Sequence, residues 1–99
     1  MTASLRFTSE LWEPEHGKWR FVTVPLELSE EIAGRSADRS AGFGSVRVQV
    51  TIGSTTWQTS VFPDSKTGCY VLPVKKSVRE TEEIDDDDPV DVVLELLLP

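Results

Sequence analysis

Cysteine, histidine and long hydrophobic runs are scarce in this sequence, and each shortage excludes a class of protein. The one cysteine, Cys69, permits no intrachain disulfide and no zinc site made of several cysteines. The one histidine, His16, lies in a turn-like segment with no recognisable nucleophile or acid to make it catalytic. No apolar run reaches the roughly 20 residues that a membrane helix needs, and no secretory signal follows Met1. We therefore expect a cytoplasmic protein that does not enter a membrane.

Positive charge is also limited. The chain has 17 acidic and 10 basic side chains, which give a formal net charge of -7. A negative field repels phosphate backbones and anionic membranes, so nucleic acid is a disfavoured partner. Salt screens distant charges, however, so a local basic patch can still act at short range. Hydrophobic residues make up 38% of the chain, enough for one core and hence for one domain over residues 1–99.

Alternation of apolar and polar residues predicts a mostly β fold. In residues 45–52 every second residue is Val or Ile, which is typical of a half-buried strand. Gly53 with Ser54 predicts a tight turn, because glycine adopts positive φ, and residues 55–62 form the return strand. The same reasoning predicts further strands at 5–11, 19–24, 69–72 and 90–98.

Two short helices are expected between these strands. In residues 29–33, Ser29 is a candidate N-cap, followed by two glutamates that suit the first turn of a helix. In residues 74–82, Val74 and Val78 are four apart and share a helix face.

The two helices occupy matching places in a weak internal repeat. In each half a strand ends at a proline, Pro25 or Pro73, and a helix and another strand follow. Proline suits this place because it has no N–H for a strand ladder and is tolerated where a helix begins. The repeat favours two interlocked strand–Pro–helix–strand halves that form one barrel without long open edges. A chance match in a small α+β chain is the alternative.

Several segments resemble a bacterial family of small domains of unknown function. They are residues 19–22, 24–25, 42–48, 52–53, 56–57 and 68–79. Members of this family stand alone or precede a YdeI/OmpD-associated region. The resemblance covers roughly residues 5–96 and implies a double-split β-barrel, similar in fold to AbrB- and MazE-like swapped-hairpin proteins. Two chains build one barrel in AbrB-like proteins, so the duplicated chain is expected to be a monomer. The sequence departs from the pattern at Asp87-Asp88, where Gly-Asp is usual, which affects the expected turn.

The most informative charged residues are Lys75, Lys76 and Arg79. At spacings of three and four, either lysine shares a helix face with Arg79. Such a face either holds an anion or an acidic partner, or is simply solvated.

Other candidate sites have simpler explanations. Residues 85–88 are all Asp but lack the Gly and Glu of a calcium loop, and residues 63–68 lack the glycines of a phosphate cradle. Cys69 is more typical of a core filler than of a reactive thiol. The tryptophans suit core packing better than a stacking surface. We predict no metal, no cofactor and no catalytic residue.

These observations favour a non-enzymatic binding or interaction module. Its partner is expected to be an unknown protein or a small anionic ligand held by the basic helix face. An AbrB-like DNA-binding regulator or antitoxin is one alternative, against which the acidic charge counts. A small enzyme or ligand-binding domain without a recognisable catalytic motif is the other.

Overall fold

A computed structural model describes residues 4–14, 17–36 and 44–97. These residues form six strands and two helices, so the predicted fold class, mostly β with two short helices, is confirmed. In chain order the elements are β1 (Ser4–Glu10), β2 (Phe21–Thr23), α1 (Leu26–Ser36), β3 (Val46–Ile52), β4 (Thr55–Asp64), β5 (Cys69–Pro73), α2 (Lys76–Thr81) and β6 (Pro89–Leu96).

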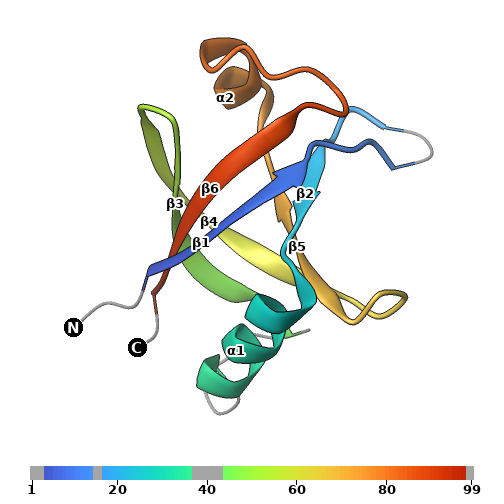
Figure 1. The fold of residues 1–99 in the computed structure, drawn as a ribbon, viewed down its shortest axis with the longest axis vertical. Helices are drawn as coiled ribbons and strands as arrows, with labels where there is room; N and C mark the ends of the chain where they lie inside the picture. The colour runs from blue at the N-terminus through green and yellow to red at the C-terminus, as the bar shows by residue number, and fades with distance from the viewer. Residues whose placement is uncertain (1–3, 15–16, 37–43, 98–99) are drawn as a thin grey trace.

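The six strands form one antiparallel sheet that curves almost into a closed barrel. Their order is β1-β6-β3-β4-β5-β2. The two outer strands meet through an isolated bridge between Trp12 and Phe21. In Figure 1, β1 and β6 cross in front of β4 and β5, and α1 and α2 lie at opposite ends of the barrel. The closure is incomplete within the described residues, because β4 pairs with β5 only from Phe62 to Asp64.

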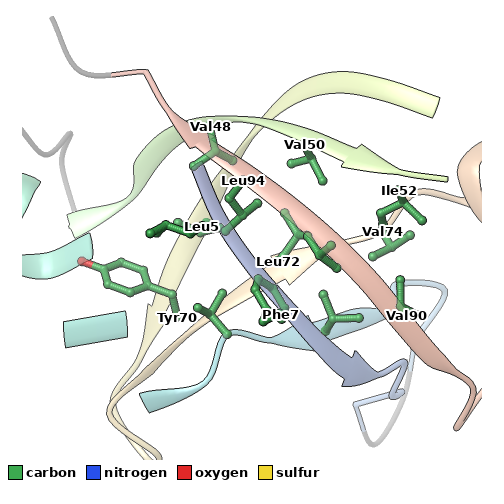
Figure 2. Packing of buried hydrophobic residues seen from close by; sticks show 14 of the residues in the cluster. Leu5, Phe7, Val48, Val50, Ile52, Tyr70, Leu72, Val74, Val90 and Leu94 are labelled. Carbon is green, nitrogen blue, oxygen red and sulfur yellow. The ribbon is translucent and has the colours of Figure 1, made fainter. Parts of the chain in front are cut away.

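The core is built from the apolar face of each strand. Every second residue of β3, from Val46 to Ile52, is buried, as the alternation predicts. Every other strand and both helices add at least one buried hydrophobic side chain to the same cluster. Figure 2 shows these side chains gathered between the strands. Each fully buried Val or Leu side chain contributes about 1.5–3 kcal/mol to folding.

The first helix begins earlier than its sequence suggests, at Leu26, directly after Pro25. Ser29 is therefore not an N-cap, and this prediction is wrong. Its hydroxyl is buried and donates to the carbonyl oxygen of Val24 at 3.0 Å, while the Tyr70 N–H donates to the same hydroxyl at 2.9 Å. The Ser29 hydroxyl instead satisfies the Tyr70 N–H and the Val24 carbonyl oxygen. These main-chain groups are buried away from water, so they need a hydrogen-bond partner more than the exposed end of the helix does.

The second helix begins later than predicted, at Lys76, with Lys75 as an extended N-cap residue. Val74 does not join the helix, since its N–H donates to the carbonyl oxygen of Arg20 at 2.9 Å and continues the pairing of β5 with β2. Lys75 is therefore outside the helix, and only Lys76 and Arg79 of the predicted basic face belong to it.

The internal repeat is larger than predicted, because β1 and β4 belong to it as well. The halves β1–β2–α1–β3 and β4–β5–α2–β6 have the same order, and β2 pairs with β5 while β3 pairs with β6. The two helices begin fifty positions apart. The same spacing relates the bridge between Trp12 and Phe21 to the pair of Phe62 and Val71.

The two prolines, which are 48 positions apart, are thus not equivalent residues. Pro25 follows the end of β2, whereas Pro73 is the last residue of β5 and pairs with Phe21. The interlocked halves are real, but the prolines that suggested them give the wrong spacing.

Candidate ligand-binding site

The structure brings the three predicted residues, Lys75, Lys76 and Arg79, to one surface hollow of about 380 Å³. Lys18 and Trp19, from the segment before β2, line the same hollow together with Val74. We call it the basic hollow. Four cationic side chains from two distant parts of the chain thus meet here, although the chain as a whole is acidic.

Arg79 has a structural contact as well as a charge. Its Nε donates to the carbonyl oxygen of Val74 at 3.1 Å, and its Nη2 donates to that of Lys18 at 3.4 Å. The half-buried guanidinium therefore ties the segment before β2 to the start of α2. These bonds hold the walls of the basic hollow together.

The two lysines are more loosely held. The Lys75 ammonium lies 6.0 Å from the centroid of the Trp57 ring, at the outer limit of a cation–π contact. The Lys76 ammonium lies 3.9 Å from the carboxylate of Glu80, and both side chains are largely exposed. An exposed pair at this distance contributes little, so Lys76 can exchange Glu80 for another anion at small cost.

Trp19 forms a wall between the basic hollow and a second, apolar depression. Its side chain is 61% exposed, which is unusual for a residue of this size. The depression has a volume of about 460 Å³, and we call it the apolar groove. It is lined by Trp19, Phe21, Thr59, Phe62, Val71 and Pro73.

The apolar groove was not predicted from the sequence. The alternation of residues 55–62 holds a signal, because Phe62 falls on the face opposite to the buried Val61. Trp19 carries a second signal, because it lies between two charged residues, Lys18 and Arg20, which are typical of an exposed segment. The three tryptophans do not form one stacking surface. Trp57 packs against the core, and the ring of Trp12 lies 5.3 Å from that of Phe21.

The acidic residues 85–88 form a hydrogen-bonded turn. The Asp85 N–H donates to the Asp88 carboxylate at 2.8 Å, and the Asp87 N–H donates to the carbonyl oxygen of Leu11 at 2.8 Å. Asp87 has a φ of 70°, so it adopts the left-handed conformation at the place where glycine is expected. The Asp86 carboxylate accepts a hydrogen bond from Arg20 at 2.8 Å. The turn thus joins β6 to the end of β1.

Glu82, just after α2, fastens that helix to the turn between β3 and β4. Its carboxylate accepts hydrogen bonds from the hydroxyls of Thr55 at 2.6 Å and Ser54 at 3.2 Å. The bond from Thr55, assisted by Ser54, lowers the pKa of the Glu82 carboxyl from its ordinary value. Gly53 has a φ of 59°, and a Cβ there would overlap the Glu82 carboxylate.

The remaining candidates lie apart from the basic hollow. The Cys69 thiol is partly buried and contacts the carbonyl oxygen of Thr67 at 3.9 Å. His16 lies outside the described residues. Within those residues, His, Cys, Asp and Glu side chains nowhere gather in threes in a metal-binding arrangement. None of the described helices has the length and apolarity to cross a membrane.

The fold and the site define a small β-barrel domain with a basic hollow beside an apolar groove. Residues 7–94 match the family described as a domain of unknown function, DUF1905. Because this match covers most of the chain, the chain belongs to that family. A comparison with curated proteins finds no match.

Proposed function

We propose that this domain is a non-enzymatic binding module whose basic hollow holds the anionic group of a ligand or protein partner. The observation that carries the proposal is the convergence of Lys18, Lys75, Lys76 and Arg79 beside the exposed Trp19. Like charges repel one another, and among the described residues the carboxylate of Glu80, 3.9 Å from Lys76, offsets this repulsion only in part, so a further anion is favoured. An exposed aromatic ring next to cations is also common at binding surfaces.

The side chains that line the basic hollow also favour binding over catalysis at this place. The described residues that line the basic hollow include no carboxylate, histidine, serine or cysteine. Such side chains most often provide a nucleophile or an acid–base pair. We propose that the module acts as a cytoplasmic monomer, since both halves of the barrel come from one chain.

A matched pair of small probes tests the proposal. 3-Phenylpropionate carries an aromatic ring and a carboxylate, and its amide has the same shape without the charge. We expect the acid to shift the NMR resonance of the Trp19 indole N–H, with the amide binding about tenfold more weakly or worse. A Trp19→Phe variant identifies that resonance. Equal binding of the two probes would show that charge plays no part.

Reversing the charge of the two lysines provides a second test of the proposal. The double variant Lys75→Glu/Lys76→Glu should fold normally, since both side chains are exposed, but should not bind 3-phenylpropionate. Arg47→Glu/Lys66→Glu makes the same change in net charge at exposed positions away from the hollow and should keep binding. Survival of binding in the first variant rejects the site. Tight binding of labelled duplex DNA at physiological salt would instead favour the DNA-binding alternative.

A further inference from the structure

We infer that the ligand is an extended acidic peptide segment of a partner protein. Its aromatic or branched aliphatic side chain lies in the apolar groove, and its carboxylates lie over the basic hollow. This inference rests on the proposed function and extends its site across Trp19, which lines both depressions.

Neighbouring strands of the barrel separate at two places. Within the described residues β1 and β2 form no ladder, and their backbones are joined by the isolated bridge between Trp12, just after β1, and Phe21; we call their separation the first split. β4 and β5 pair only from Phe62 to Asp64 on β4, although β4 begins at Thr55, and we call this the second split. The fifty-residue repeat makes the two splits equivalent.

Polar side chains close the first split. The Ser9 hydroxyl donates to the carbonyl oxygen of Thr23 at 2.7 Å. The Trp12 indole N–H donates to the Thr23 hydroxyl at 2.9 Å, and its ring packs on Phe21. Each of these contacts joins β1, or the residues just after it, to β2.

Within the described residues, the second split does not repeat these contacts. Fifty positions after Ser9, Trp12 and Thr23 stand Thr59, Phe62 and Pro73. The Phe62 side chain has no N–H to donate, and Pro73 has no hydroxyl to accept a hydrogen bond. These three residues line the apolar groove instead, with Phe62 45% exposed. The second half thus exposes an apolar surface where the first half is sealed.

The shape of this surface favours an extended chain over a compact small molecule. Small-molecule sites usually enclose most of their ligand, whereas the groove and the hollow are shallow depressions side by side on the surface. Among the described residues, no strand pairs with the part of β4 before Phe62 on the β5 side. An extended peptide can use such unpaired main chain and place alternate side chains in neighbouring pockets.

Charge complementarity favours an acidic peptide and disfavours a nucleic acid. Four cationic side chains adjoin one end of the apolar groove. A peptide with one or two carboxylates can use them without strong repulsion from the net charge of -7. A nucleic acid carries a phosphate at every nucleotide and meets the whole negative field of the domain.

Synthetic peptides with matched changes test the inference. The probe is a short Gly/Ser peptide with a central phenylalanine flanked by two glutamates. One control replaces the glutamates with glutamines, and the other replaces the phenylalanine with alanine. We expect the probe to shift the Trp19 indole resonance, with the controls binding about tenfold more weakly or worse. The Trp12 indole N–H, which is bonded to Thr23, should shift much less than that of Trp19.

A pair of variants places the binding on the protein. Phe62→Ala removes one wall of the apolar groove and should abolish peptide binding. Leu26→Ala removes an exposed side chain of similar apolar character, 52% exposed, from α1 and should leave binding unchanged. Circular dichroism checks that both variants fold.

The remaining outcomes separate the two proposals. Binding of 3-phenylpropionate without binding of the peptide overturns the inference and leaves the proposed function in place. Binding of neither probe overturns both. Peptide binding that survives Phe62→Ala shows that the groove is not the site. Sedimentation of the free protein as a dimer that Phe62→Ala dissolves would make a second copy the occupant, which also overturns the inference.

Discussion

The two halves of the barrel use different side chains to satisfy an equivalent main-chain carbonyl oxygen. At the end of β2 the Ser29 hydroxyl donates to the carbonyl oxygen of Val24 at 3.0 Å. Fifty positions later, at the end of β5, Arg79 Nε donates to the carbonyl oxygen of Val74 at 3.1 Å. The serine is buried and adds nothing to the surface. The arginine satisfies its carbonyl and also brings a positive charge to the basic hollow.

This difference shows where to look for function in a barrel with two similar halves. Positions that serve the barrel in both halves, such as Val22 and Leu72, are fully buried and apolar in each. At other equivalent positions, one half has a side chain that closes the barrel and the other half has an exposed or charged one. The fold itself does not require the exposed or charged residue at such a position. The basic hollow and the apolar groove both depend on residues of the second kind.

The largest expected effect is on the free energy of unfolding, which Ser29→Ala should lower more than Arg79→Ala. Ser29→Ala leaves the buried N–H of Tyr70 without a partner, so we expect a loss of about 1–3 kcal/mol in the free energy of unfolding. Arg79→Ala exposes the Val74 carbonyl to water and should cost only about 0.5–1.5 kcal/mol. Urea denaturation measures both. A larger loss for Arg79→Ala would mean that the two residues do not have the contrasting roles described above.

A smaller effect is expected from exchanging residues between the splits. Trp12→Phe gives the first split the residue of the second and removes the hydrogen bond to Thr23, at a cost of about 0.5–1.5 kcal/mol. Phe62→Trp should bring no matching gain, because Pro73 offers no hydroxyl at the place equivalent to Thr23. Thermal unfolding of the two variants compares them. A stabilised Phe62→Trp protein would contradict the comparison of the splits.

The smallest effect concerns Glu82, which stands fifty positions after the buried Ile32. Its pKa is lower in the folded protein than in the unfolded chain, chiefly because of the bond from Thr55. Its contribution to stability is therefore present above about pH 4.3, the unfolded value, and is lost as the pH falls through the folded value. The stability difference between the parent and Glu82→Gln should shrink in acid. Urea titrations at neutral and acidic pH measure it, and a difference that grows in acid would reverse the sign.

The strands could be predicted because their signals are local. The alternation in residues 45–52 needs only the period of a strand, and β3 is found at Val46–Ile52. The turn at Gly53 needs only the freedom of glycine, and its φ is 59°. The order of strands and helices in each half follows from the same signals. The fold class was therefore accessible without any knowledge of long-range contacts.

The residues at which the helices begin, and the residues that form the site, could not be predicted from local patterns alone. They depend on contacts between residues that are far apart in the sequence. Ser29 resembles an N-cap until Tyr70, a residue of another strand, is placed beside it. The hollow could be predicted only in part, because Lys18 comes from a distant segment and the sequence does not show that it meets α2. The exposure of Trp19 likewise depends on how far the barrel closes. The spacing of residues along the chain does not show which distant residues come into contact in the fold.

The pairing of β1 with β6 also has a kinetic consequence. It places Ser4 opposite Glu95, and Figure 1 shows β1 and β6 side by side. Within this domain β1 is synthesised before β6, so it must wait for β6 before it finds this partner. Contacts so distant in sequence slow folding, since a long loop must close before they form. A newly made chain thus passes through a period in which β1 is exposed and in need of protection from aggregation.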